Sequence, residues 1–417
     1  MIAADLVVRD LAEAATLDGP APPRTGGAMS ELGVVPRAAV AVDRGRVVWV
    51  GGERALRRSV RLRAGARIVE GGGGTLVPGF VDAHTHVLFA GDRAHELPLK
   101  VTGATYAEIA RRGGGLYSTV RATRRASDAE LLRSAAGRLA RMAAWGTTSL
   151  EVKSGYALDH AGELRLLRLV PRLARATGLR LVPTYLGAHA VAPEFLRRPD
   201  AYVDRIVRAT LPEVARRGLA RFCDVFCEPG FFSVRQSERI LRAARRLGLG
   251  LKIHADEFVL SGGARLAARL GATSADHLLA TPSSDRQRLA GAGVVAVMLP
   301  LTGWTAAPPR RSPAREMVDA GVAVALGTDC SPNSWVEAMP LVLAAAVHTG
   351  RLTPAEALTA ATVNAAHASG IEDAGVVRAG ASADFSVFPV PSAERLGYRF
   401  DVRPTCVYRQ GKPVSPP

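Results

Sequence analysis

The stretch PGFVDAHTHVLFAGDR, residues 78–93, carries the strongest indication of both the fold and the chemistry. It is an apolar run that ends in His84 and His86, with a single residue between them. Side chains two apart in a β-strand project from the same face, so both imidazoles could reach one metal ion. The pair alone is equally compatible with two histidines packed in a core, so the rest of the chain has to distinguish these interpretations.

Downstream of this stretch the sequence alternates between short apolar runs and longer amphipathic segments. The candidate strands lie at residues 75–86, 148–154, 179–189, 221–228, 249–257, 272–278, 293–300 and 322–329. Eight short strands, each followed by a helical segment, predict a (β/α)₈ barrel of the TIM type.

Two of the helical segments carry clear start patterns. One begins with Ser127 as the cap and Glu130 as its capping-box partner. Another, over 353–370, begins with Thr353, and Pro354 follows at the first helical position. These patterns place helices between the predicted strands, as a barrel requires.

Both ends of the chain differ from the middle in being strand-like and rich in turns. The Asp-Arg-Gly sequence at 43–45 separates two alternating apolar runs and predicts a hairpin. The sequence therefore predicts an α/β protein: residues 78–371 form the barrel, and a small β-sandwich combines residues 1–77 with residues 372–417.

Polar residues follow the predicted strands at the points where the strands end. They are His84, His86, Lys153, His189, Glu228, His254, Glu257, His277 and Asp329. In a (β/α)₈ barrel the chemistry lies at the C-terminal ends of the strands, so these residues predict a site at that face.

A metal centre is the first feature predicted there. His84, His86, His254 and Asp329 offer three imidazoles and a carboxylate, a ligand set that suits one Zn²⁺ or Fe ion and leaves a position for water. Asp82 lies on the same face as the histidine pair, and we assign it to structural hydrogen bonding.

Two further residues are predicted to act on the reaction. Glu257 follows His254 by three residues and could move a proton between an attacking water and a leaving nitrogen. His277 could stabilise negative charge or add a further ligand. A surface glutamate and a packed histidine are the alternatives for these two positions.

Three residues on loops after the strands are candidates for substrate binding. Arg93 offers a planar fork suited to a carboxylate, and Tyr156 and His189 offer hydrogen bonds to a polar ring. Lys153 could become a carbamate between two metals, but we favour an ion pair with Glu151 or another nearby carboxylate.

The composition argues against several classes of partner. The net charge of +16 comes mostly from arginines at helical spacing, and aromatic residues are only 5% of the chain, so we expect solvated helix faces and no nucleic-acid partner. No apolar run is long enough to span a membrane. Four cysteines without paired spacing predict reduced thiols, and the sequence favours a soluble, cytoplasmic protein.

Several longer stretches resemble the amidohydrolase superfamily. They include AMSELGVV, PGFVDAHTHVLFAGDRAHE, GGGLYSTVRATRRAS, TTSLEVKSGYALD, YLGAHAVAPEF, DVFCEPGFFS, KIHADE, ADHLLAT and ALGTDCSPNS, and the ending GYRFDVRPTCVYRQGK is similar too. The HxH and HADE motifs occur across the superfamily, whereas FAGDR and EVKSGY are similar to its branch that degrades histidine.

The resemblance implies an activity and a set of residue roles. The reaction is hydrolysis of the ring amide of 4-imidazolone-5-propanoate, a small acidic substrate, to N-formimino-L-glutamate. His84, His86, His254 and Asp329 hold one Zn or Fe ion, and Glu257, His277 and Asp329 act on the attacking water and the intermediate. The substrate is bound by Arg93, Tyr156, His189, Glu257, Ser331, Asn333 and Ser334. A homodimer is also implied.

The chain departs from this family at two places. After Asp329 the sequence CSPNS has Ser331 where the resemblance leads us to expect asparagine and Asn333 where it leads us to expect glycine, while Ser334 matches. The segment MLPLTGW at 298–304 also differs. A sibling amidohydrolase, such as a deaminase or another cyclic amidase, is therefore the alternative function. A barrel that has lost catalysis is disfavoured, because a binding protein has no need of the full histidine and carboxylate set.

Overall fold

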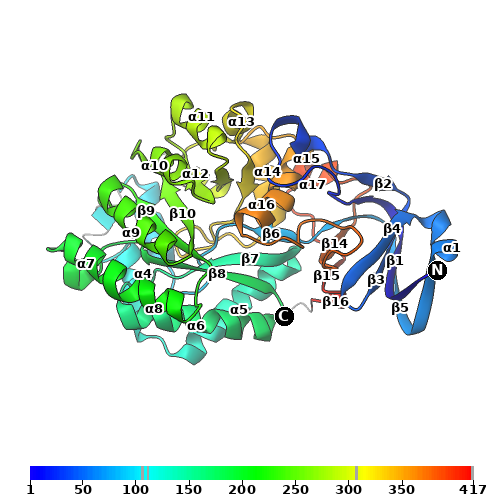
Figure 1. Ribbon diagram of the computed structural model, residues 1–417, viewed down its shortest axis with the longest axis horizontal. Helices are drawn as coiled ribbons and strands as arrows, with labels where there is room; N and C mark the ends of the chain where they lie inside the picture. The colour runs from blue at the N-terminus through cyan, green and yellow to red at the C-terminus, as the bar shows by residue number, and fades with distance from the viewer. Residues whose placement is uncertain (105–107, 110–111, 306–308, 415–417) are drawn as a thin grey trace.

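Eight parallel strands form one of two sheets in the computed structural model, which describes residues 1–417 except 105–107, 110–111, 306–308 and 415–417 (Figure 1). They pair in chain order as β6 (Phe80–Asp82), β7 (Thr147–Lys153), β8 (Arg180–Ala188), β9 (Phe222–Cys227), β10 (Gly250–Ala255), β11 (Ser274–His277), β12 (Val295–Met298) and β13 (Val324–Leu326). Each predicted strand segment overlaps one of them, so the predicted barrel is confirmed.

The residues that follow β6 and β13 meet and bring the two ends of this sheet together. Asp329 N donates to His84 O at 3.0 Å, and His86 N donates to Cys330 O at 2.9 Å. Gly327 makes this approach possible, because a Cβ at that position would lie 2.9 Å from the Cβ of His84. The barrel therefore closes at a seam that places His84, His86 and Asp329 beside one another.

Helices surround the barrel strands (Figure 1). After β6 come α2 (Leu97–Val101), α4 (Leu116–Arg125) and α5 (Asp128–Ala144), and the later helices are α6 (His160–Thr177), α7 (Pro199–Arg205), α8 (Leu211–Arg216), α9 (Val234–Arg246), α10 (Gly263–Leu270), α11 (Ser283–Gly291), α12 (Pro300–Thr305), α13 (Ala314–Asp319), α14 (Met339–His348), α15 (Pro354–Ala360), α16 (Val363–Ala368) and α17 (Glu394–Tyr398). None of the helices in the described part of the chain has the length and apolarity that crossing a bilayer requires.

The helix starts agree with the predictions, and one helix end does not. Ser127 and Thr353 each form a complete capping box. The single helix expected over 353–370 is divided into α15 and α16, because Thr362 leaves the helical region with φ −129° and ψ −95°. Its hydroxyl donates to Leu358 O at 2.6 Å, the kind of local side-chain bond that competes with a continuous helix.

Exposed arginines line the outer faces of α6 and α9, as their spacing predicts. Of the eight arginines at positions 165, 168, 172, 175, 235, 239, 242 and 246, all but Arg165 are exposed. The excess positive charge in these two helices therefore lies on solvated surfaces. The four cysteines are free thiols, also as predicted.

The second sheet combines both ends of the chain. Its strands are β1 (Ile2–Ala15), β2 (Val34–Pro36), β3 (Ala38–Asp43), β4 (Arg46–Gly52), β5 (Val60–Pro78), β14 (Phe385–Phe388), β15 (Cys406–Arg409) and β16 (Lys412–Pro413). They run in the order β16-β15-β14-β5-β1-β3-β4, with β2 paired to β1. The antiparallel pair β3–β4 is the hairpin predicted at 43–45. The short helix α1 (Leu56–Ser59) precedes β5.

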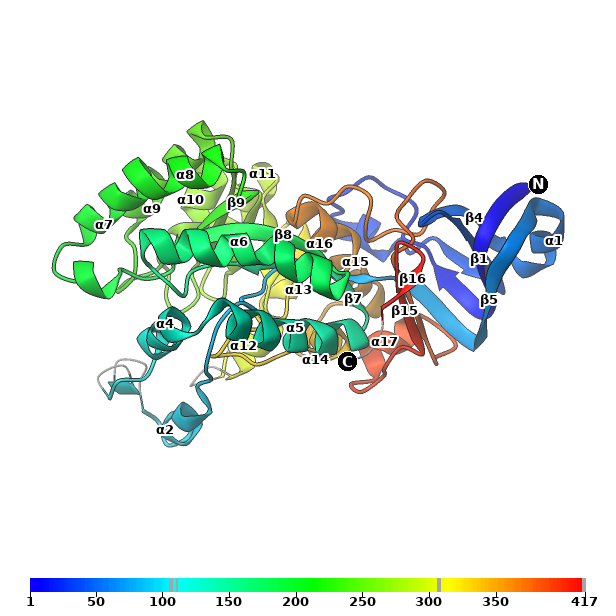
Figure 2. The ribbon, with the colours of Figure 1, turned by 90° about the horizontal axis from the view of Figure 1, so that it is seen from below.

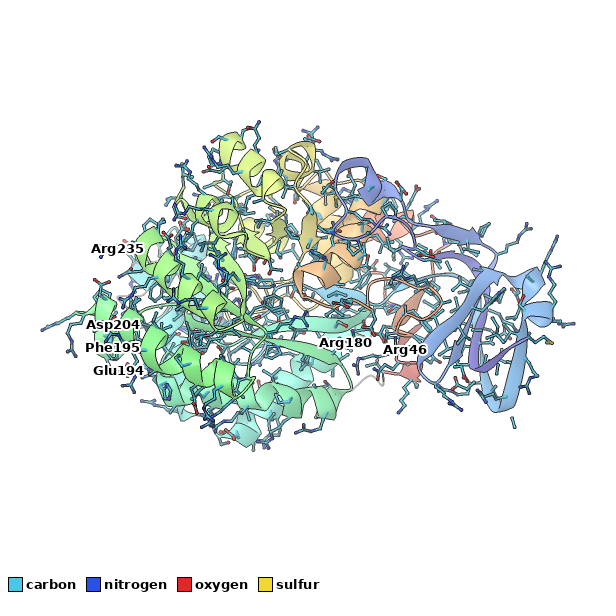
Figure 3. The ribbon with its side chains drawn as sticks, viewed as in Figure 1. Arg46, Arg180, Glu194, Phe195, Asp204 and Arg235 are labelled. Carbon is cyan, nitrogen blue, oxygen red and sulfur yellow. The ribbon has the colours of Figure 1, made fainter. Side chains whose placement is uncertain are left out.

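The second sheet is attached at the N-terminal end of β6, because β5 ends at Pro78 and β6 begins at Phe80. Arg46 of β4 and Arg180 of β8 both pair with Asp373 across the junction (Figure 3). In Figure 2, α2 lies at the end of the molecule away from the second sheet. The C-terminal ends of the barrel strands are therefore left clear of the second sheet.

A buried arginine holds the loop that follows the histidine pair. Arg138 of α5 is 2% exposed and donates to Val87 O at 2.8 Å and to Phe89 O at 3.2 Å. Its guanidinium lies 3.6 Å from the centre of the Phe89 ring, and burial lowers the pKa of Arg138 to about 10. The cation thus satisfies backbone carbonyls directly between His86 and Arg93.

We expect Arg138→Met to destabilise the protein by about 3 kcal/mol, because two buried carbonyls lose their donor. Urea unfolding followed by circular dichroism measures the change. Arg133→Met is the matched control, since Arg133 lies on the same helix and is exposed. Equal unfolding midpoints for the two variants would contradict the role given to Arg138.

Candidate metal centre and active site

Three histidines and an aspartate converge at the C-terminal end of the barrel. His84 Nε2 and His86 Nε2 are 3.1 Å apart, and Asp329 Oδ1 lies 3.6 Å from each of them. The ring of His254 lies 4.5 Å from that of His84, measured between ring centres. One nitrogen of each histidine falls within 4.8 Å of the others. The structure therefore brings together all four residues predicted to bind metal.

Two buried aspartates orient the imidazoles. His84 Nδ1 lies 2.6 Å from Asp276 Oδ2, and His254 Nδ1 lies 2.9 Å from Asp224 Oδ2. A carboxylate beside Nδ1 keeps the proton on that nitrogen and leaves a lone pair on Nε2. Burial also lowers the pKa of His84 well below its ordinary value, so the imidazole is neutral and its lone pair is available.

The donor set fits a metal ion. Two Nε2 atoms 3.1 Å apart, as in His84 and His86, can both bind one ion at the usual distance of about 2.0–2.1 Å. His254 Nε2 is buried and has no hydrogen-bond partner among the described residues. Thr302 donates to Asp329 Oδ2 at 2.8 Å, which leaves Oδ1 directed at the histidines. Burial raises the pKa of Asp329 to about 6. The protein therefore has a histidine-rich metal site, whose individual ligands remain a prediction.

A cluster of buried charges lies next to these ligands. Lys153 Nζ is 2.7 Å from Asp224 Oδ2, 2.9 Å from Glu151 Oε2 and 3.4 Å from Asp276 Oδ2. Burial opposes the charge on Lys153, but these carboxylates outweigh it and raise its pKa. Lys252 Nζ lies 3.2 Å from Glu151 Oε1. Lys153 thus forms the ion pair that we favoured over a carbamate.

Sequence reasoning missed Asp224, Asp276 and Lys252 as parts of this site. The sequence contains an indication of two of them, Lys252 and Asp276, because polar residues recur at every second position in β10 and β11, whereas Asp224 lies between Phe222 and Phe226. Lys252 is two residues before His254, and Ser274 is two residues before Asp276. Residues two apart face the same side of a strand, so a buried strand with this pattern directs polar groups into the barrel.

Glu257 is placed beside the metal site by the loop after β10. Glu228 accepts hydrogen bonds from the backbone amides of Glu257 at 3.2 Å, Phe258 at 3.2 Å and Val259 at 2.8 Å. Burial raises the pKa of Glu257 well above its ordinary value, and the negative charges of Asp329 and Glu228 add to the effect. The Glu257 carboxyl is therefore a group that readily holds a proton near the site.

His277 lies next to Glu257 at the end of β11. Its Nε2 is 3.7 Å from Glu257 Oε2, and burial lowers the pKa of His277 well below its ordinary value. The backbone of His277 has φ 73°, a conformation that non-glycine residues adopt rarely and that is common at functional sites. A neutral imidazole thus faces the carboxyl that we predict to move protons.

A cavity opens over the metal site. The predicted site residues that line it are His86, Arg93, Tyr156, His189, His254, Glu257, His277, Asp329, Ser331 and Asn333. Leu116 and three phenylalanines add an apolar wall. His84 is fully buried, below the cavity lining. Predicted site residues from separate strands and loops thus line the same cavity.

Two loop residues define one side of this cavity. His189 Nδ1 lies 3.1 Å from Gly155 O, and burial lowers the pKa of His189 to about 3, so its ring is neutral. Gly155 has φ 102°, and a Cβ there would lie 3.1 Å from the His189 ring. This glycine allows His189 and Tyr156 to lie side by side, with ring centres 5.3 Å apart.

Arg93 forms a buried ion pair at the cavity wall. Its Nε and Nη2 atoms donate to Glu96 Oε2 at 2.9 and 2.7 Å. The other oxygen, Glu96 Oε1, accepts from Gly115 N at 2.7 Å. Glu96 therefore fixes the Arg93 guanidinium in a position from which it can still contact a ligand in the cavity.

The segment after Asp329 forms a tight turn. Ser331 N donates to Ser334 O at 2.9 Å, and Ser334 N donates to the Ser331 hydroxyl at 3.1 Å. Ser334 also lies 3.2 Å from the hydroxyl of Thr302 and is not among the residues lining the cavity. Ser331 and Asn333 face the cavity, so the two positions that differ from the expected pattern are the two in reach of a ligand.

Comparison with known proteins agrees with this site. A model of the amidohydrolase family matches residues 75–414, which is most of the chain. The chain belongs to the amidohydrolase family. An imidazolonepropionase from Symbiobacterium thermophilum is 47% identical over 398 residues, 94% of this chain and 93% of that protein. Another from Herpetosiphon aurantiacus is 42% identical over 415 residues, 97% of this chain and 95% of that protein. The predicted resemblance is confirmed.

Two solved structures of other enzymes share the fold. An adenosine deaminase from Xanthomonas campestris with bound zinc has a TM-score of 0.73 at 21% identity, and the match covers 99% of this chain and 93% of that one. An N-isopropylammelide isopropylaminohydrolase from Burkholderia multivorans has a TM-score of 0.70 at 20% identity over 98% and 97% of the two chains. At this identity the likeness establishes the fold alone.

Proposed function

We propose that this protein hydrolyses the ring amide of 4-imidazolone-5-propanoate to N-formimino-L-glutamate. The observation that carries the proposal is 47% identity to an imidazolonepropionase over 94% of this chain. The cavity supports it, because an arginine suited to a carboxylate and a buried glutamate beside a metal site line the same space. No observation favours the alternative of a deaminase, because the adenosine deaminase structure resembles this chain in fold at only 21% identity.

In this proposal His84, His86, His254 and Asp329 hold one ion, zinc or iron. When bound there, the ion supplies Lewis acidity, which activates water near neutral pH and polarises a carbonyl oxygen. The protein contributes the geometry of the site, since Asp276, Asp224 and Thr302 fix the orientation of three of the four ligands.

The other residues bind the substrate and move the proton. A bond forms between the water oxygen and the ring carbonyl carbon, the ring C–N bond breaks, and the proton lost by the water ends on the nitrogen. Glu257 accepts that proton and returns it to the leaving nitrogen. His277 lies close enough to Glu257 to stabilise its carboxylate before the proton is taken up. Arg93 binds the propanoate group, while Tyr156 and His189 contact the ring.

The test is turnover of freshly generated imidazolonepropanoate by the metal-loaded protein, followed as loss of the ring absorbance. We expect hydrolysis with N-formimino-L-glutamate as the product. Metal analysis of the same sample determines whether the ion is zinc or iron. A metal-loaded protein that leaves the substrate unchanged would contradict the proposal. The homodimer and the cytoplasmic location stay predictions. Light scattering, which measures the mass of the particle in solution, tests the homodimer.

Arg93→Ala is expected to raise KM for the acidic substrate by roughly ten- to a hundredfold, because a charge-assisted hydrogen bond is worth about 1.5–3 kcal/mol. We expect kcat to change much less, since Arg93 binds the end of the substrate remote from the reacting bond. Steady-state kinetics measures both constants. Arg235→Ala is the control, because Arg235 is exposed on α9 (Figure 3). An unchanged KM in Arg93→Ala would remove Arg93 from the binding site.

A further inference from the structure

A second cation lies at the edge of the cavity, on the short helix α2. Lys100 Nζ donates to Asn333 Oδ1 at 2.5 Å, and Asn333 lines the cavity. The Lys100 side chain is half-buried. The helix α2 (Figure 2) follows the loop that carries Arg93, so one segment after β6 contains both cationic residues.

The charges around Lys100 are unbalanced. Glu96 is the nearest acidic residue in sequence, but its oxygens are engaged by Arg93 and by the amide of Gly115. Among the residues with described positions, no carboxylate lies within 4 Å of Lys100 Nζ, whose partner is the neutral amide of Asn333. Burial and the positive charge of Arg93 lower the pKa of Lys100, and the negative charge of Glu96 offsets only part of this. Two cations thus share one carboxylate, which favours the arrival of an anion.

We propose that Lys100 is a second binding group for the acidic end of the substrate and that Asn333 holds it in position. With Arg93 it forms a two-cation site for a carboxylate at the mouth of the cavity. The inference rests on the proposed function, which supplies an acidic ligand. Because the ammonium has three donors, Lys100 can keep its bond to the Asn333 amide and donate a second one to a carboxylate, which gives it a charged partner beside the neutral one.

Asn333 explains why this arrangement belongs to this chain. The family resemblance leads us to expect glycine at position 333, and glycine has no side chain that could accept from Lys100. The asparagine amide provides that acceptor across 233 residues of sequence. The departure at position 333 therefore positions a cation in addition to changing the cavity wall.

Binding of an unreactive acid and its neutral counterpart tests the proposal. The probes are imidazole-4-propanoate and imidazole-4-propanamide, titrated calorimetrically into the metal-loaded protein. We expect Lys100→Met to weaken binding of the acid about tenfold, the effect of losing one charge-assisted hydrogen bond, and to leave binding of the amide unchanged. Lys412→Met is the matched control, because Lys412 is exposed on β16 of the second sheet.

A second variant separates the two residues. Asn333→Gly is expected to weaken binding of the acid by roughly threefold, because Lys100 keeps its charge but loses its anchor. Acid binding unchanged in Lys100→Met would overturn the proposal. Equal weakening of acid and amide would overturn it as well, because Lys100 would then only support the cavity wall.

Turnover distinguishes this inference from the proposed function. A wild-type protein that binds the acid through Lys100 but does not hydrolyse imidazolonepropanoate would contradict the proposed function and support the two-cation site. A protein that hydrolyses the substrate with the same KM in wild type and Lys100→Met would contradict the two-cation site alone. We expect hydrolysis by both proteins, with KM raised about tenfold in Lys100→Met.

Discussion

Glu257→Gln is expected to lower kcat about a thousandfold, the usual contribution of a well-placed general acid–base group, while the protein keeps its metal. Glutamine has nearly the same shape as glutamate, so the backbone bonds that Glu228 makes to this loop should persist. The amide cannot accept and return a proton, and that is the role given to Glu257. Binding of substrate should change much less than turnover.

The measurement pairs steady-state turnover with metal analysis of the same preparation. Glu194→Gln is the control, since Glu194 lies at the periphery of the barrel and pairs there with Arg124 (Figure 3). Loss of turnover with a full metal content supports the proton-transfer role. Near-normal turnover in Glu257→Gln would show that another group moves the proton.

The fold could be predicted from sequence because it depends on local patterns. Short apolar runs that end in polar residues, separated by amphipathic segments, are enough to place eight strands and the helices between them. Capping residues such as Ser127 and Thr353 then fix where helices begin. The interruption at Thr362 was missed, because a local side-chain bond there outweighs a continuous helical pattern.

The residues that offer chemistry could also be named from sequence, but their mutual arrangement could not. His84 and Asp329 are neighbours only because hydrogen bonds join the segments after β6 and β13. Asp276 contacts His84 across 192 residues, and nothing local marks that pairing. The identity of the partners of each imidazole is set by barrel closure and strand register, which the sequence of one chain does not reveal.

The two segments that differ from the family pattern also depend on contacts between distant parts of the chain. Thr302 belongs to the segment that departs from the expected sequence, and it donates to the Asp329 carboxylate. Asn333 belongs to the other departing segment, and it anchors Lys100. The family resemblance marks both segments as unusual, whereas only the structure gives Thr302 and Asn333 a physical role.

His254→Ala is expected to abolish both metal retention and turnover. His254 Nε2 is a buried nitrogen that has no hydrogen-bond partner in the described part of the chain, and it completes the histidine set. Loss of residues that merely support a ligand weakens metal binding by about 10–100-fold, so loss of a ligand itself should weaken it by more. Removing the imidazole leaves Asp224 paired with Lys153 and supplies no new ligand at the site.

His189→Ala is the matched control, because His189 is also a buried histidine of the cavity and lies outside the histidine group that could hold an ion. We expect that variant to keep its metal and to lose substrate affinity. Metal content after dialysis, and the rise in melting temperature on adding zinc, measure retention independently of activity. If His254→Ala kept one ion per chain and the same rise in melting temperature as wild type, the ion would have to be held without His254, and the ligand set proposed here would be wrong.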